Sequence, residues 1–444
     1  MTLPPEALTP AWALIQDAPT YRTVDALVLR SAFARPIELP REGFAAVAAP
    51  LSRATLFTQR SLVLNQLLFN AYEQSNLYLP RRAFAAEDTA AFEAYYRPEL
   101  VAALSWLKPT LEASAFGWLE ASLSAPPRTG EAFRAQCLEL LDGYEAVPSQ
   151  LPARVRAAKD PKAAARAFLI QLAPDFLSEA SQMARSMPGN FGPLHSELTK
   201  IFIDEFGYGV WDQKHSTLFE RCMASVGLSS EVNAYYRWYL PSSLLMTSYF
   251  YWVTTAKHRW FDYLGALYWI EAVVPHFNRQ FSALLKERFG ADTDTRYFDE
   301  HVGIDLHHRR MVLDRLITPA LATYGDAIVP ALHRGLQMAR ALGDLAEHDY
   351  LEQLAFGDGL SPRPAPAHPG AATTLRPGQV LGPRVVDATQ VLHVQRGVLD
   401  VQVGDGVSHP VPQGHEVTVP QGRLVGAQAG ADGAVFTLGP VAAS

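Results

Sequence analysis

Apolar residues recur at helical spacing from about residue 53 to residue 357, and this pattern predicts a largely α-helical protein. Asp160 and Pro161 have the residue types of a helix N-cap and of a first helical position, so we expect a helix to start there. The segment KERFG predicts that another long helix ends near Gly290. The first 125 residues also look helical but contain no convergent polar set, so we assign them to packing or self-association.

The pattern changes after residue 357. The stretch DGLSPRPAPAHPGAATT is rich in Pro, Ala and Gly, which is typical of a semi-extended linker. Short runs of alternating or β-branched residues, such as TQVLHVQRG and HEVTVPQG, follow between Gly turns and predict a small antiparallel barrel. We therefore expect a helical N-terminal domain over residues 1–125, a central helical domain over 126–357, a linker over 358–374 and a β-domain over 375–444.

Composition narrows the choice of partners and compartment. With 444 residues, 48% of them hydrophobic, the chain can bury cores in several domains. The formal net charge is −7 and the basic residues are scattered, which argues against nucleic-acid binding. Two cysteines, Cys137 and Cys222, make no disulfide framework and are expected to be inert core thiols. The N-terminus resembles no secretory signal, and the apolar stretch near 240–255 is too polar to span a bilayer, so we expect a cytoplasmic protein without a membrane partner.

Three metal-ligand side chains share one face of a predicted helix in HVGIDLHH. His301, Asp305 and His308 stand at positions i, i+4 and i+7, which form one stripe along an α-helix. Apolar neighbours on both sides indicate that much of this helix is buried. Buried imidazoles beside a carboxylate need partners, and a metal ion would supply them. A solvated or hydrogen-bonded structural role is the alternative.

Further carboxylates and one more histidine extend this candidate set. Glu271 is a lone carboxylate in the apolar run LGALYWIEAVV, where burial is costly unless a cation such as a metal ion or Arg279 compensates it. Glu205 and His215 lie on either side of a glycine-rich bend. Glu179, taken by its pattern alone, indicates a surface residue on an apolar helix. Oxygen-rich sets with two or three imidazoles suit iron or manganese better than structural zinc.

These residues together resemble the haem-oxygenase-like diiron oxidase and oxygenase family across about residues 130–345. That family places a Glu and a His around a kinked helix, a Glu on a long helix and a His-x-x-x-Asp-x-x-His triplet on the last core helix. The matching residues in this sequence are Glu205, His215, Glu271, His301, Asp305 and His308. The resemblance implies a helical bundle that holds two iron ions, uses O2 as co-substrate and receives electrons from an external donor.

The resemblance also bears on Glu179 and on the two terminal domains. The N-oxygenating members have an additional upstream carboxylate ligand, and Glu179 stands where that ligand would fall. Members with a helical N-terminal domain use it for dimerisation, which implies a homodimer, and carry a C-terminal cupin. In the cupin-like segment of this chain the usual metal-ligand positions hold Pro383, Val385, Gln390 and Val425, none of which binds a metal, so we expect that site to be lost.

The family resemblance implies a non-haem diiron N-oxygenase that hydroxylates a nitrogen of an amino-acid-derived amine or guanidine, in specialised-metabolite biosynthesis. One alternative is a diiron oxidase that cleaves a C–C bond of a fatty acid or amino acid. A second alternative is a metal-free small-molecule-binding protein on the same fold. An amine or guanidine substrate would need a carboxylate or aromatic partner, whereas an α-amino acid would also need an Arg.

Overall fold

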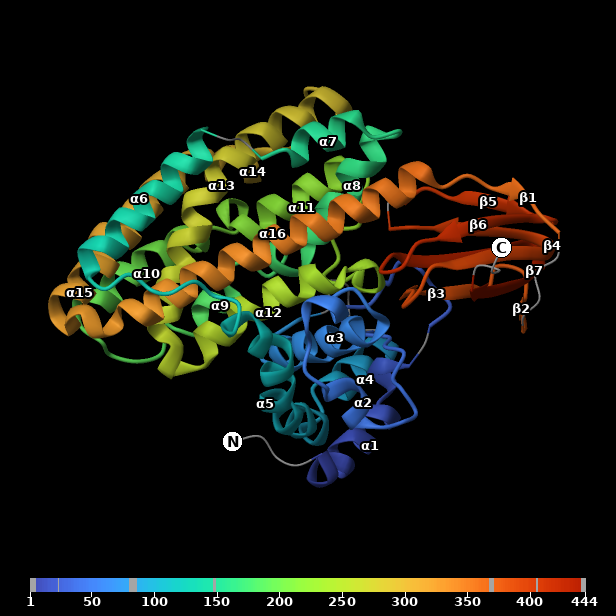
Figure 1. Cartoon of the computed structure of the whole chain (residues 1–444), viewed down its shortest axis with the longest axis horizontal. Coiled ribbons are helices and arrows are strands. Elements are labelled where there is room, and N and C mark those ends of the chain that lie inside the picture. The colour runs from blue at the N-terminus through green and yellow to red at the C-terminus, as the bar shows by residue number, and fades with distance from the viewer. Residues whose placement is uncertain are drawn as a thin grey trace.

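The computed structural model describes residues 5–22, 24–79, 86–146, 149–366, 371–404 and 406–440. Long helices form the body of the molecule, and a β-sheet domain caps one end of it (Figure 1). The N-terminal helices pack beside the central helices and close to the sheet (Figure 1). The mainly helical fold with a C-terminal sheet domain confirms the predicted class. Within the described ranges, no helix is both long and apolar enough to cross a membrane.

The N-terminal helices share one hydrophobic core with the central helices, since the same buried cluster contains Leu64, Leu107, Leu244 and Leu336. Helix α3 lies against both α5 and α12 (Pro241–Thr255). The bounds of the N-terminal helices are α1 (Thr9–Asp17), α2 (Phe44–Ala48), α3 (Gln59–Glu73), α4 (Ala86–Tyr95) and α5 (Pro98–Glu120).

A buried polar cluster in this N-terminal part contradicts our expectation that it holds no convergent polar set. The Arg35 guanidinium is fully buried and faces the rings of Tyr95 and Tyr236 at 5.4 and 5.6 Å from their centroids. The Glu73 carboxylate accepts a hydrogen bond from Tyr251 at 2.7 Å. The pattern missed this cluster because its members come from α3, α4, a loop and the central domain, and they meet only in the folded chain.

The central domain consists of long helices joined by short turns. Its bounds are α6 (Gly130–Ala146), α7 (Leu151–Ala157), α8 (Pro161–Phe176), α9 (Ser181–Ala184), α10 (Pro193–Glu205), α11 (His215–Ser225), α12 (Pro241–Thr255), α13 (Trp260–Phe289), α14 (Arg296–Arg310), α15 (Thr318–Tyr324) and α16 (Val329–Gly359). A π-helical segment, Met311–Ile317, connects α14 to α15.

Two helix boundaries follow the predicted chemistry. The Asp160 carboxylate accepts hydrogen bonds from the backbone N–H groups of Lys162 and Ala163, which confirms it as the N-cap of α8. Gly290 follows the last residue of α13 with a φ of 112°, a conformation that L side chains rarely adopt.

Both cysteines are buried and free, and burial raises the pKa of Cys137 to about 12, as expected for inert core thiols.

Helices α13 and α16 approach each other closely because each contributes a glycine to the contact. A β-carbon at Gly335 would lie 1.8 Å from the Asp262 carbonyl oxygen, and one at Gly265 would lie 2.0 Å from the Leu332 carbonyl oxygen. Next to this contact, Asp262 accepts hydrogen bonds from Arg334 Nη2 at 2.8 Å and Nε at 2.5 Å. This contact holds α13, which carries Glu271, firmly against α16.

We therefore expect Gly335→Ala to destabilise the protein by about 1–3 kcal/mol or more, because the backbone of α13 would have to move away. Gly117→Ala on α5 is the matched control, since nothing lies within 4 Å of an added β-carbon there. The control substitution should be neutral or stabilising by up to about 1 kcal/mol, as alanine favours helix more than glycine does. Thermal and urea unfolding of both variants would check this, and equal stabilities would contradict the close-contact explanation.

The C-terminal strands form an antiparallel sheet that is not closed, so the predicted barrel was wrong in this respect. Their bounds are β1 (Arg363–Pro364), β2 (Ala372–Leu375), β3 (Val380–Val385), β4 (Gln390–Gln402), β5 (His409–Pro412), β6 (His415–Val419) and β7 (Leu424–Pro440). The sheet runs in the order β1-β6-β4-β7-β2, with β3 beside β7 and β5 beside β4. Alternation predicts which residues face the core, but it does not determine whether the edge strands pair.

The long pair β4 and β7 explains the shape of this domain. Register shifts between Val394 and Arg396, and again between Gly397 and Leu399, interrupt the pairing and allow the pair to bend. Different short strands then pair with different parts of β4 and β7 around an apolar core. Strand β1 and most of β2 fall within residues 358–374, where we expected a linker.

Candidate metal centre

The predicted ligands come from separate elements of the central domain. Glu179 lies in the turn between α8 and α9, Glu205 is the last residue of α10, and His215 is the first residue of α11. Glu271 lies in α13, and the triplet His301, Asp305 and His308 lies on α14. Six of these seven residues are buried, and the Glu179 side chain is 16% exposed, so the pattern-based surface assignment of Glu179 does not hold.

The structure brings six of the predicted ligands into two groups that share Glu205. Ligand atoms of Glu179, Glu205, His215 and His301 all lie within 4.8 Å of one another, and so do those of Glu205, Glu271 and His308. Both groups combine carboxylate oxygen with imidazole nitrogen, the donor set that suits iron. Glu205 is the one carboxylate that belongs to both groups.

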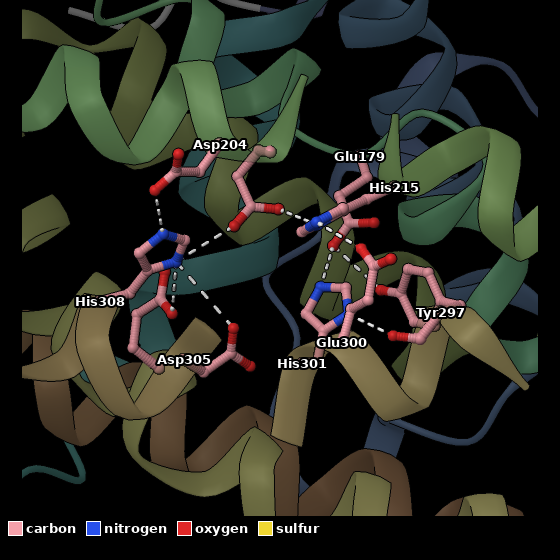
Figure 2. Close-up of polar contacts among 10 residues, drawn as sticks. Glu179, Asp204, His215, Tyr297, Glu300, His301, Asp305 and His308 are labelled. Carbon is pink, nitrogen blue, oxygen red and sulfur yellow. Dashed lines mark hydrogen bonds and ion pairs between the residues drawn. The ribbon is translucent and has the colours of Figure 1, made fainter. Parts of the chain in front are cut away.

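In the first group, carboxylates face two imidazoles (Figure 2). His215 Nδ1 lies 2.6 Å from Glu205 Oε2, and His301 Nε2 lies 3.3 Å from Glu179 Oε1. The two imidazole rings have centroids 4.3 Å apart. Glu300 lies at the edge of this group, with its Oε2 3.9 Å from His215 Nε2.

In the second group, His308 Nδ1 points at three carboxylates. It lies 3.3 Å from Glu205 Oε1, 3.5 Å from Glu271 Oε2 and 4.0 Å from Asp305 Oδ1. Glu271 therefore faces His308, and within the described part of the chain no ion pair joins it to Arg279. Asp305 lies between the two histidines on α14, but it does not belong to either group of converging atoms.

Neighbouring groups orient two of the imidazoles. His301 Nδ1 lies 2.6 Å from the Tyr297 carbonyl oxygen, and His308 Nε2 lies 3.0 Å from Asp204 Oδ2. Since a carbonyl and a carboxylate only accept, these ring nitrogens carry protons, and in the neutral imidazoles the lone pairs are on His301 Nε2 and His308 Nδ1. This is the usual arrangement behind metal-binding histidines, in which the distal N–H donates to an acceptor.

Three buried atoms in the cluster form no hydrogen bond although they face other polar groups. They are His301 Nε2, His308 Nδ1 and Glu179 Oε2. Buried polar atoms without partners are costly, and these three are potential metal donors aimed at the centre of the cluster. The residues present therefore fit a metal site.

Mutual electrostatic effects within the cluster support the same interpretation. Burial alone would lower the pKa of His301, but the charges of Asp305 and Glu179 raise it well above its usual range. Burial would raise the pKa of Glu205, but His215 and the other imidazoles lower it instead. In the metal-free chain, protons on imidazoles balance the carboxylates, and metal cations would replace those protons.

A cavity of about 100 Å³ adjoins the cluster. Its polar wall includes Glu179, Glu205, Glu271, His301 and Asp305, and its apolar wall includes Phe250, Leu267, Ile270 and Val274. The Tyr263 hydroxyl, which also lines it, is buried without a hydrogen-bond partner. The cavity is therefore bounded by the polar cluster and by apolar side chains.

Sequence reasoning missed three residues at this site: Asp204, Tyr297 and Glu300. Tyr297 supports the cluster twice, because its hydroxyl donates to Glu179 at 2.9 Å and its carbonyl accepts from His301. Asp204 adjoins Glu205 in the sequence, and Tyr297 stands one helical turn before His301. These positions relative to predicted ligands were the only signals available to find them.

We expect Asp204→Asn to weaken iron binding at the His308 position by about 10- to 100-fold, the usual effect of removing such an outer partner. The amide could donate to His308 Nε2 as well as accept from it, so the proton would no longer be fixed there. Asp212→Asn is the control, because Asp212 is exposed and pairs with Arg221 away from the cluster. Competitive iron titrations would measure both variants, and unchanged affinity in Asp204→Asn would contradict the orienting role.

Comparisons with known proteins place this site in a family. Residues 166–343 match a model described as an iron-containing redox enzyme. The chain is also 35% identical to nitrosourea synthase from Streptomyces achromogenes subsp. streptozoticus over 423 residues, which cover 91% of this chain and 88% of that protein. The chain belongs to the haem-oxygenase-like family of iron-containing redox enzymes.

Family membership agrees with the position of the cluster in the chain. The matched segment, residues 166–343, contains every predicted ligand from Glu179 to His308. The similarity to nitrosourea synthase extends beyond it, since 91% of the chain is aligned. The predicted family is therefore confirmed, and the chain is an oxidoreductase of the iron-containing type.

Proposed function

We propose that the protein is a diiron N-oxygenase, which uses O2 to hydroxylate a nitrogen of an amine or guanidine. The observation that carries this proposal is the position of Glu179, whose carboxylate oxygen converges with Glu205, His215 and His301. An upstream carboxylate at this place is associated with the N-oxygenating members that the sequence resembles. The similarity to nitrosourea synthase, whose name denotes a product with an N–N bond, supports nitrogen as the atom oxidised.

In this proposal Glu179, His215 and His301 would hold one iron, Glu271 and His308 would hold the other, and Glu205 would contribute an oxygen to each. Asp305 lies beside His308 and completes the negative wall of the cavity. Bound iron would supply O2 reduction and oxygen transfer. An external donor returns two electrons in each turnover, since the sequence contains no flavin or iron–sulfur motif.

The protein's own residues hold the donor atoms in place and keep water out. The Tyr297 hydroxyl holds one Glu179 oxygen, which leaves the other carboxylate oxygen without a hydrogen bond. The Tyr297 carbonyl and the Asp204 carboxylate fix the tautomers of His301 and His308. Phe250, Leu267 and other apolar residues line the opposite wall, and a dry wall strengthens each electrostatic contact in the site.

The overall reaction balances with one O2, two electrons and two protons for each N–H group converted to N–OH, with water as the second product. We expect iron-loaded protein to form such a product when it receives a reductant, O2 and a set of amines and guanidines. Mass spectrometry with ¹⁸O2 should show one labelled oxygen in the product. Glu179→Ala should retain the fold but lose the labelled product.

A different product would overturn the proposal. Carbon dioxide or an alkene without an N–O bond would identify a C–C-cleaving oxidase instead. Failure to bind iron would identify a metal-free binding protein. A labelled N–O product formed by the wild-type protein but not by Glu179→Ala would support N-oxygenation and the role of Glu179.

A further inference from the structure

A second cavity, of about 240 Å³, adjoins the cavity at the metal centre. We call it the side cavity. The two cavities share four lining residues, Asp175, Phe176, Ile270 and Val274. Asp344 lines the side cavity with a side chain that is 70% exposed, so the cavity reaches the surface there. The side cavity is therefore open to the surface at α16 and shares a wall, which includes Asp175, with the cavity at the metal centre.

Asp175 has the properties of a binding group for a cation. Its Oδ1 accepts a hydrogen bond from Gln182 Nε2 at 2.7 Å, a neutral partner. Among the residues that the structure describes, no Lys, Arg or His forms an ion pair with the Asp175 carboxylate. Burial and the charge of Glu179 raise the pKa of Asp175 to about 7, so a cationic ligand would stabilise its charged form.

The other residues that line the side cavity also favour a cationic ligand. Besides Asp175, two carboxylates line it, Asp344 and Glu347, and Arg340 contacts only the exposed Asp344, at 4.0 Å. In the described chain, neither cavity has a Lys or Arg in its lining, and His276 is the one lining group of the side cavity that can become cationic. Its aromatic lining residues, such as Trp269, offer ring faces to a cation.

We propose that the side cavity admits a cationic amine or guanidine that carries no carboxylate, and that Asp175 positions its charged group beside the metal centre. This inference rests on the proposed function, because it assigns the side cavity to the substrate of that reaction. A ligand with a carboxylate would find no arginine or lysine in the cavity lining and would face the carboxylates already there. The acidic opening at Asp344 and Glu347 attracts the same class of cation from solution.

The test uses two pairs of ligands that differ by one carboxylate: agmatine against arginine, and putrescine against ornithine. Each would be titrated calorimetrically into full-length, Fe(II)-loaded protein without O2, so that no turnover occurs. We expect each decarboxylated ligand to bind at least about tenfold more tightly than its counterpart. Asp175→Asn should weaken the decarboxylated ligands by about 10- to 100-fold, the usual effect of losing a charge-assisted hydrogen bond, at unchanged iron content.

Two further variants distinguish the positioning of the ligand by Asp175 from the general effect of removing a negative charge. Asp175→Glu keeps the charge and should recover part of the affinity. Asp344→Asn is the matched control at the exposed opening and should weaken binding by less than about fivefold. Equal or tighter binding of the carboxylate-bearing ligands, no binding by any ligand, or equal losses in Asp175→Asn and Asp344→Asn would overturn the proposal.

The result is distinguishable from a failure of the proposed function. If the wild-type protein takes up iron normally and forms an N–O product but does not bind the decarboxylated ligands, only the role of the side cavity is refuted. Ligand binding by a chain that takes up no iron would refute the diiron function and leave the cation site standing.

Discussion

Glu205→Ala is expected to remove iron from both positions at once and to abolish turnover. Glu205 is the one residue common to both groups of converging donor atoms, and its two oxygens face different imidazoles, His215 and His308. Loss of this carboxylate also leaves the buried His215 without its closest negative partner. Iron per chain after anaerobic loading and desalting should fall below one.

Glu271→Ala and Glu179→Ala are the matched comparisons, because each removes a carboxylate from one group only. Each should therefore retain about one iron under conditions that strip Glu205→Ala. Circular dichroism would show whether all three variants keep the helical fold. If Glu205→Ala retained as much iron as the other two variants, the shared-ligand assignment would be wrong.

Arg423→Met should lower the free energy of unfolding by about 3–5 kcal/mol, because it leaves a buried carboxylate unpaired. Arg423 lies 3.3 Å from Asp349 Oδ1 and donates to the Asp349 backbone carbonyl at 3.0 Å, which joins the sheet domain to α16. Both side chains are buried. Arg384→Met is the control, since Arg384 pairs with Glu38 at the surface and should cost less than about 1 kcal/mol.

The loss in Arg423→Met should also depend on pH. Burial raises the pKa of Asp349 to about 6 even with Arg423 present, and without Arg423 it should rise further. A folded-state pKa above the unfolded value means that stability falls as pH rises through the folded pKa. Urea unfolding should therefore show a larger penalty at pH 8 than at pH 5, and a penalty that is equal at both would contradict this explanation.

Helical periodicity predicted the helical class, and the resemblance of the ligand pattern to a known family predicted that family and most of the site. His301, Asp305 and His308 share a face because a helix repeats every 3.6 residues, so their placement on one face of α14 followed from spacing alone. Glu179 was different, since only the resemblance distinguished it from a surface residue. Its role depends on the turn after α8, which no periodic pattern encodes.

Other features depend on contacts between distant segments and were therefore not predictable from local pattern. Asp204 orients His308 only because the end of α10 meets α14. Arg35 and Glu73 lie in the segment where the sequence showed no convergent polar set, yet both are buried next to tyrosines. The strand pattern predicted a β-domain, but the strand order and the register shifts between β4 and β7 depend on pairing between distant strands.

The measurement that tests the central claim most directly is the amount of iron bound per chain in an anaerobic Fe(II) titration of the wild-type protein. Two groups of donors sharing Glu205 predict saturation at about two irons per chain. Exposure of the loaded protein to O2 should then consume O2 only when iron is bound. Saturation at one iron, or no binding, would contradict the diiron centre and with it the proposed oxygenase.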